Sequence, residues 1–261
     1  MKMVKVLAIA NQKGGVGKTT TTVNLAASLA AMKQRVLLID LDPQGNATMG
    51  SGIDKRELPV TIYHVLLGSK ELQEARLHSV AGKYDVLPAN RELAGAEIEL
   101  VSLQQRETRL KDALQSVMTE YDYILIDCPP ALNLLTLNGL CAARSVMIPM
   151  QCEYYALEGL SDLVNTIRKV RAHLNPDLEI EGLLRTMFDP RNTLAQQVSE
   201  QLQQHFGEKV YRTVIPRNVR LAEAPSYGVP VLCHDKLSKG TLAYLALAGE
   251  LLNNAAQPAQ A

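Results

Sequence analysis

Residues 11–20 read Asn-Gln-Lys-Gly-Gly-Val-Gly-Lys-Thr-Thr, and they follow directly on an apolar run from Val4 to Ala10. The apolar run is short and β-prone, whereas apolar residues recur at helical spacing over residues 19–32. The glycines therefore lie between a strand and the start of a helix, where free backbone N–H groups and the helix dipole attract phosphate. The stretch predicts a phosphate-binding loop.

Individual positions of this loop are expected to have separate roles. Lys18 would reach the β- and γ-phosphates of a nucleotide, and the Thr19 hydroxyl would ligate Mg²⁺. The glycines allow the backbone to turn tightly and to approach the phosphate oxygens. We therefore predict nucleotide contacts from Lys13, Gly14, Gly15, Val16, Gly17, Lys18, Thr19 and Thr20.

One departure from the ordinary phosphate-loop pattern is informative. That pattern has glycine where this chain has Gln12, and here a lysine and two glycines follow at positions 13–15. The form Lys-Gly-Gly-Val-Gly-Lys-Thr-Thr resembles the deviant Walker A motif of the MinD/ParA class of P-loop ATPases. The resemblance implies ATP and Mg²⁺ as cofactors and ATP hydrolysis to ADP and phosphate. The alternative is a glycine-rich turn that carries two surface lysines.

Composition limits the classes of protein that fit. The chain has 261 residues, 47% of them hydrophobic, which suits one large α/β domain. Lysine plus arginine and aspartate plus glutamate both number 27, so the net charge is zero and DNA binding would need a local basic patch. No apolar run is long enough to span a membrane, and the N-terminal one ends at the phosphate loop, which argues against a signal peptide. The cysteines form no CxxC pair, so a zinc site is not supported.

Strand-like apolar runs alternate with helical stretches along the rest of the chain. The predicted strands cover residues 35–40, 84–88, 121–127, 145–149, 180–187 and 210–216. The predicted helices cover residues 91–118, 131–143, 156–174, 193–206 and 239–254. This alternation predicts an α/β fold with a mostly parallel twisted sheet flanked by helices on both faces. We expect a single P-loop ATPase domain over residues 1–254 and a disordered tail over residues 255–261.

Three aspartates stand where predicted strands end. Asp127 closes Tyr-Ile-Leu-Ile-Asp, which is the expected Walker B form, and would reach Mg²⁺ through water. Asp40 and Asp42 close another strand, where an ordinary Asp-Pro turn is the alternative. A hydrolase needs one acid to hold the metal's water shell and another group to orient the attacking water. We assign Asp42 to the water and Asp40 to the metal surroundings, with the order of the two left open.

Longer strings extend the resemblance over nearly the whole chain. Residues 40–48, 127–130, 151–160 and 211–228 look like the corresponding stretches of chromosomal ParA/Soj partition ATPases. Such proteins form ATP-dependent sandwich dimers, bind double-stranded DNA without sequence preference, and are discharged by a ParB-type protein bound at centromere-like sites. The resemblance implies a DNA-partition ATPase that is cytoplasmic and nucleoid-associated.

The resemblance also implies two further contacts with nucleotide. Pro216 and Asn218, with Arg217 beside them and Met187 nearby, would form the adenine pocket; an ordinary Pro-Arg-Asn turn is the alternative. Lys13 would act across the dimer, as an arginine finger does, because no obvious arginine finger follows the Walker B strand. A solvated lysine is the alternative for Lys13.

A local excess of positive charge lies between residues 211 and 240. This segment has five cations and two acids, a net charge of +3 in a neutral chain. Such a run is usually a solvated face, but a stripe doubled by dimerisation would touch several phosphates and give salt-sensitive DNA binding. Arg191, which lies outside this segment, is added to four of its cations. The predicted DNA contacts are Arg191, Arg217, Arg220, Lys236 and Lys239.

Other roles for this type of ATPase fit less well. A MinD-like, membrane-associated regulator of cell-division placement would have a C-terminal amphipathic helix with basic and bulky apolar faces. Residues 251–261 offer no such helix, so we expect no membrane partner. A relative of the nitrogenase iron protein would need cluster-binding cysteines, and Cys128 and Cys141 do not follow that pattern. A metabolic ligase would need a polar substrate pocket, and no candidate is evident.

Overall fold

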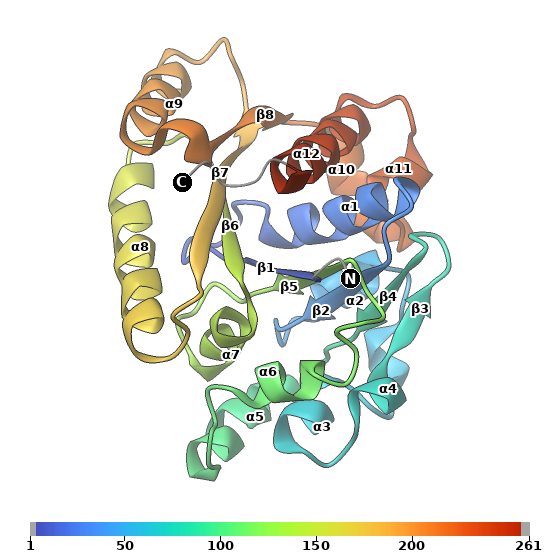
Figure 1. Ribbon diagram of the computed structural model, residues 1–261. Helices are drawn as coiled ribbons and strands as arrows, with labels where there is room; N and C mark the ends of the chain where they lie inside the picture. The colour runs from blue at the N-terminus through green and yellow to red at the C-terminus, as the bar shows by residue number, and fades with distance from the viewer. Residues whose placement is uncertain (1–3, 257–261) are drawn as a thin grey trace.

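The computed structural model describes residues 4–256, which form an eight-stranded sheet covered by helices (Figure 1). The strand order is β3-β4-β2-β5-β1-β6-β7-β8, and every neighbouring pair is parallel except β3–β4. The strands are β1 (Lys5–Ile9), β2 (Val36–Asp40), β3 (Leu77–Ser79), β4 (Tyr84–Leu87), β5 (Tyr123–Asp127), β6 (Ser145–Met150), β7 (Glu179–Phe188) and β8 (Val210–Pro216).

The predicted fold class is confirmed, and each predicted strand lies in the sheet. Only the short antiparallel strand β3 is not evident from the sequence, because Leu-His-Ser contains no apolar run. It pairs at the edge with β4, where two of its three residues are exposed.

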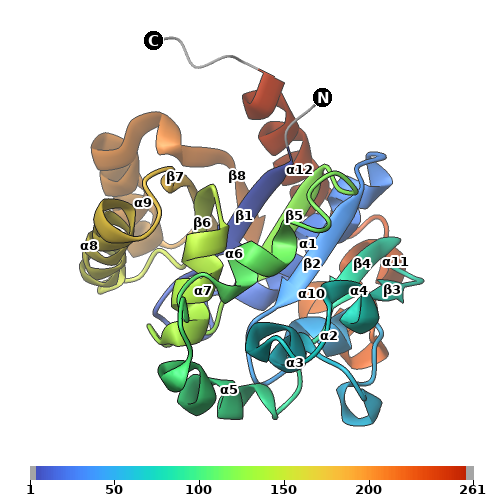
Figure 2. The same cartoon turned by 60° about the horizontal axis from the view of Figure 1, so that its bottom comes forward.

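Helices cover both faces of the sheet (Figures 1 and 2). β1 sends Val6 and Ala8 into one buried layer and Leu7 and Ile9 into the other, because successive strand residues point to opposite faces. The first layer packs against α3 (Ile62–Leu67), α4 (Leu72–Ala75), α5 (Leu93–Glu99), α6 (Arg109–Leu114), α7 (Leu134–Ala142), α8 (Ala156–His173) and α9 (Thr193–Phe206). The second packs against α1 (Lys18–Ala31), α2 (Asn46–Gly50), α10 (Val219–Glu223), α11 (Val231–His234) and α12 (Lys239–Ala256).

The prediction of one long helix over residues 91–118 is wrong. The segment contains α5, a 3₁₀ turn at Leu100–Ser102 and α6, with a non-helical stretch between them. Gln105 has a φ of +53° within this stretch, in the left-handed region that a right-handed helix cannot continue through. Apolar spacing alone does not reveal such a break.

The C-terminal helix extends slightly further than predicted. α12 runs to Ala256, two residues into the expected tail, and residues 257–261 lie outside the described part of the chain. The disorder of that tail stays a prediction. Within residues 4–256, no helix combines the length and apolar character that crossing a membrane requires.

The strand register brings the predicted site residues together. Ile9, the last residue of β1, pairs with Asp127, and Asp127 pairs on its other side with Asp40. Both aspartates are therefore at the carboxyl edge of the sheet, beside the loop that follows β1. In open parallel sheets, ligands bind at this edge.

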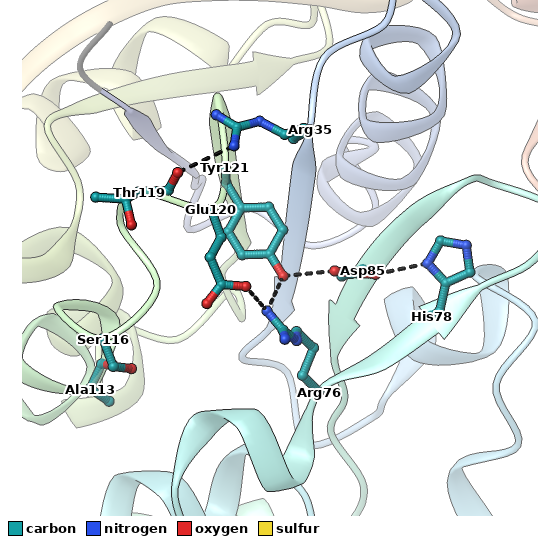
Figure 3. Close-up of polar contacts among 9 residues, drawn as sticks. All are labelled: Arg35, Arg76, His78, Asp85, Ala113, Ser116, Thr119, Glu120 and Tyr121. Atoms are coloured by element: carbon teal, nitrogen blue, oxygen red, sulfur yellow. Dashed lines mark hydrogen bonds and ion pairs between the residues drawn. The ribbon is translucent and has the colours of Figure 1, made fainter. Parts of the chain in front are cut away.

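A polar cluster joins β3, β4 and the segment leading into β5 (Figure 3). Arg76 donates to Glu120 (2.5 Å) and to the Tyr121 hydroxyl (2.8 Å). That hydroxyl donates to Asp85 (2.7 Å), whose other carboxylate oxygen lies 2.7 Å from Nδ1 of His78. Since Glu120 and Tyr121 precede β5, the cluster lies at the strand ends opposite the phosphate loop and holds the edge strand in place.

The packing of α7 on β5 gives a stability prediction. A methyl group at Gly139 would lie 2.9 Å from the Cys128 sulfur and 3.2 Å from a Leu41 methyl. We expect Gly139→Ala to lower the free energy of unfolding by about 1–3 kcal/mol, because overpacked core sites force their neighbours to move. Urea unfolding measures the change. Gly249→Ala in α12 is the matched control: no atom lies within 4 Å, so it should raise stability by about 0.5–1 kcal/mol. A stabilised Gly139→Ala protein would contradict the packing argument.

Candidate functional site

The loop between β1 and α1 has the backbone that a phosphate site requires. Gly15 and Gly17 have φ values of +75° and +88°, and Gly17 directly precedes the first residue of α1. Residues with a Cβ rarely adopt this conformation, so glycine is needed at both positions. The predicted strand–turn–helix arrangement is present.

Three side chains hold the loop against β6 and β7. Thr186 donates to the carbonyl oxygen of Val16 (2.7 Å), and Gln151 donates to that of Gly15 (3.3 Å). Asn11, at the start of the loop, donates to the carbonyl oxygen of Pro149 (2.8 Å). These hydrogen bonds attach the loop to β6, to β7 and to the segment that follows β6.

Lys18 is buried inside the loop. Its Nζ donates to the carbonyl oxygen of Lys13 (3.1 Å), and only 7% of the residue is exposed. Burial lowers the pKa of Lys18, and the negative charge of Asp127 opposes this shift. The ammonium group therefore lies where the loop closes, as expected for a phosphate ligand.

Asp127 receives hydrogen bonds from two threonines of α1. Thr19 donates its hydroxyl to one carboxylate oxygen (2.7 Å), and Thr22 donates to the other (3.0 Å). Burial and the negative charge of Asp40 raise the pKa of Asp127, and the two hydroxyls oppose the rise. A divalent cation beside this hydroxyl–carboxylate pair would compensate the buried negative charge.

The residues fit a magnesium ion that is held mainly by a nucleotide. Among residues 4–256, no group of three His, Cys, Asp or Glu side chains is arranged to hold a metal. Mg²⁺ usually takes only one or two protein oxygens together with phosphates and water. Thr19 and Asp127 supply oxygens of that kind.

Asp40 and Asp42 differ in their surroundings. Asp40 is fully buried, and its two carboxylate oxygens accept hydrogen bonds from the backbone of Asp42 (3.1 Å) and from the backbone and hydroxyl of Thr48 (both 2.8 Å). Burial raises the pKa of Asp40, and the Thr48 hydrogen bonds oppose the rise. Asp42 is partly exposed and accepts from the backbone N–H of Gln44 (2.9 Å). Asp42 is thus the more accessible carboxylate to water.

Lys13 points away from the phosphate loop. Its ammonium group pairs with Glu153 in the segment after β6, and its side chain is 48% exposed. Lys13 and Lys18, five residues apart in one loop, therefore have opposite placements. Lys13 therefore does not reach into the pocket of its own chain.

A cavity of about 200 Å³ opens beside the loop, between β7 and α10. Asn218 contributes a buried Oδ1 atom that has no hydrogen-bond partner among the described residues. Met187 has a φ of +49°, which is uncommon for a residue with a side chain of this size. The lining combines all four residues of the predicted adenine pocket with loop and helix residues: Gly17, Thr20, Thr186, Met187, Ile215, Pro216, Arg217, Asn218, Leu221, Ala222 and Tyr244.

The cations predicted to contact DNA fall into two neighbourhoods. Arg191 pairs with Asp189 (2.8 Å), and the charge of Arg217 also acts on that carboxylate. Arg220 pairs with Glu223 (2.8 Å) and Asp235 (3.3 Å). The exposed Lys236 and Lys239 follow Asp235 in the chain, and within residues 4–256 no ion pair is formed by either. Two of the five predicted cations are therefore already paired with acids.

Several site residues are not evident from the sequence. Thr22 lies two residues beyond the motif, and its i+3 spacing from Thr19 places both hydroxyls on one face of α1. Gln151, Glu153 and Thr186 are remote in sequence and reach the loop only through the sheet order, in which β6 and β7 follow β1.

Known proteins match this chain along most of its length. Residues 4–180 match a family model described as an AAA domain. The chain is 56% identical over 252 residues to the sporulation initiation inhibitor protein Soj of Bacillus subtilis. The match covers 97% of this chain and 100% of that protein. It is 55% identical over 249 residues to the chromosome partitioning protein ParA of Myxococcus xanthus, with coverage of 95% and 88%. The chain belongs to the ParA/Soj family of chromosome-partitioning ATPases.

A solved structure agrees with this family placement at the level of the fold. The structure described as cobyrinic acid a,c-diamide synthase from Mycobacterium smegmatis with bound ADP and magnesium has a TM-score of 0.86 at 41% identity, covering 97% of this chain and 95% of that one. The synthase activity is stated of that protein only. The resemblance to ParA/Soj proteins is confirmed, and this protein is a chromosome-partitioning ATPase.

The buried position of Lys18 gives a prediction for this ParA/Soj ATPase. We expect Lys18→Ala to weaken ATP binding on the order of 100-fold, because a charge-assisted hydrogen bond contributes about 1.5–3 kcal/mol. Calorimetric titration with Mg-ATP measures the affinity. Lys111→Ala, at an exposed lysine of α6, is the control and should bind as wild type does. Unchanged affinity of the Lys18 variant would exclude its phosphate role.

Proposed function

We propose that this ATPase works as a nucleotide-switched dimer on DNA. Mg-ATP binding closes two copies into a sandwich, the dimer binds double-stranded DNA without sequence preference, and hydrolysis stimulated by a ParB-type protein resets it. The protein would then be cytoplasmic and nucleoid-associated. The outward position of Lys13, paired with Glu153 and away from its own phosphate pocket, is the observation that carries this proposal.

ATP with Mg²⁺ is the nucleotide that the pocket supports best. The unpartnered Oδ1 of Asn218 is a buried acceptor, and such an atom favours a donor. The adenine amino group is a donor, whereas guanine has a carbonyl oxygen at the same position. The related structure that holds ADP and magnesium supports the same ligand class.

The proposed roles at the phosphates follow the geometry of the carboxyl edge. Lys18 and the loop N–H groups hold the phosphates, and Thr19 and Asp127 hold Mg²⁺ with Asp40 close by. Asp42 orients the attacking water, because it is the more exposed of the two neighbouring acids. Lys13 from the second copy neutralises charge on the transferring phosphoryl group.

Mixing two inactive variants tests the action of Lys13 across the dimer. We expect Lys13→Ala and Asp42→Ala to bind ATP but to hydrolyse it poorly. In a mixed dimer, the Lys13→Ala subunit keeps its own Asp42 and receives Lys13 from its partner, so one complete site forms. ATPase activity should therefore reappear on mixing.

The matched control replaces Lys13→Ala by Lys18→Ala in the mixture. Lys18 serves its own pocket, so no complete site forms and activity should stay absent. If the Lys13 mixture also stays inactive while dimers form normally, Lys13 is a solvated lysine and the proposal fails.

The proposed DNA face comprises Arg191, Arg217, Arg220, Lys236 and Lys239. One monomer offers few phosphate contacts, whereas a nucleotide-closed dimer would align two such faces. Arg220 is a poor test residue, because a charge reversal there would add a third acid beside Glu223 and Asp235. The exposed Lys236 and Lys239 are cleaner tests.

We predict DNA binding that requires ATP, ignores sequence and weakens steeply with salt. Lys236→Glu or Lys239→Glu should weaken binding to all sequences alike and reduce the salt slope by roughly 0.9 for each lost phosphate contact. Fluorescence anisotropy with two unrelated duplexes measures both quantities. Lys169→Glu is the matched control, because Lys169 lies on α8, on the opposite side of the molecule from α11 and the lysines that follow it (Figure 1). If the ATP-bound protein binds neither duplex at low salt, the proposed DNA binding fails.

A further inference from the structure

The loop that carries Asp42 is attached at both ends to one carboxylate. Asp40 accepts from the backbone N–H of Asp42 through one oxygen (3.1 Å). Its other oxygen accepts from the backbone N–H and the hydroxyl of Thr48 (both 2.8 Å). Asp40 thus closes residues 41–48 into a ring-like turn at the end of β2.

The same turn is fastened to the segment that follows β4. The Thr48 hydroxyl, besides donating to Asp40, accepts from the backbone N–H of Ala89 (2.9 Å). Gly45, with a φ of +60°, lies so close that a Cβ there would be 2.6 Å from the Ala89 carbonyl oxygen. Thr48, Gly45 and Ala89 are all buried. The turn therefore rests on Ala89 at two points.

We propose that Thr48 is a positioning residue for ATP hydrolysis. Its single hydroxyl links Asp40 to Ala89 and so holds the turn that presents Asp42 to the attacking water. The inference rests on the proposed role of Asp42. A displacement of about 1 Å at such a group can reduce a rate by about 100-fold, so a fixed turn has a direct effect on turnover.

The chemistry of this position requires a hydroxyl. The group must donate to a carboxylate and accept from an N–H at the same time, and both capacities are used. Valine has the shape of threonine but neither capacity, so it would leave the Ala89 N–H buried without its acceptor. Serine retains both capacities.

Two substitutions at Thr48 separate the hydroxyl from the packing. We expect Thr48→Val to lower kcat on the order of 10- to 100-fold without a comparable change in the ATP dissociation constant. Thr48→Ser should keep a kcat close to that of wild type. Thr48→Ala replaces the valine variant if that protein does not fold, and thermal unfolding of every variant reports on folding.

Ser51→Ala is the matched control. Ser51 follows α2 and also has a buried hydroxyl, which donates to the Ala47 carbonyl oxygen (2.7 Å) and lies 2.8 Å from the Tyr84 hydroxyl. It makes no hydrogen bond to Asp40 or Ala89 among the described residues. The variant should lose stability, yet kcat should stay at the wild-type level.

A double variant decides whether Thr48 acts through Asp42. In the Asp42→Ala background, Thr48→Val should cause no further loss of single-turnover rate, because the turn has no carboxylate left to position. A wild-type kcat in Thr48→Val, or an equal loss in both backgrounds, would overturn the proposal while the role of Asp42 stands. Full hydrolysis by Asp42→Ala alone would overturn the assignment of Asp42 and this inference with it.

Discussion

The parallel register of β2, β5 and β1 is the constraint on which the rest of the site depends. It puts Asp40 and Asp127 side by side at the carboxyl edge, next to the loop that follows Ile9. Two carboxylates buried this close repel each other, and the structure compensates with hydroxyl and N–H donors from Thr19, Thr22 and Thr48. These donors lie on α1 and α2, so both helices must pack at the carboxyl edge for the buried carboxylates to keep their hydrogen bonds.

The strands on the other side of β1, β6 and β7, hold the loop in place through hydrogen bonds. Neighbouring residues of β7 connect the loop with the cavity beside it: Thr186 holds the loop at Val16, and Met187 lines the cavity. Gln151 links the same two places, since its amide contacts Gly15 and lies 2.8 Å from the Met187 sulfur. The loop and the cavity thus form a single connected surface, and a shift of β7 would move both.

Local sequence was sufficient to predict the position of those parts of the candidate site that depend on neighbours in the chain. The phosphate loop, Lys18 and Asp127 follow from strand–turn–helix patterning and from an acid that ends an apolar run. Glu153 and Thr186 could not be predicted in this way, because they meet the loop through sheet order rather than through sequence. The break in the helix predicted over 91–118 depends on the left-handed backbone of Gln105, which apolar spacing does not encode. Likewise, β3 owes its place to pairing with β4 and not to its own composition.

The closely spaced carboxylates have a consequence for the lifetime of the protein in the cell. A ligand that binds only the folded state stabilises it in proportion to the logarithm of its concentration, and a cation that relieves a buried repulsion does so at the centre of the sheet. If magnesium nucleotide binds beside these carboxylates as proposed, molecules without it retain that repulsion and would unfold more often. Since degradation follows the unfolded population, cellular proteases would remove empty molecules before loaded ones. The abundance of the protein would then follow the supply of its own ligand.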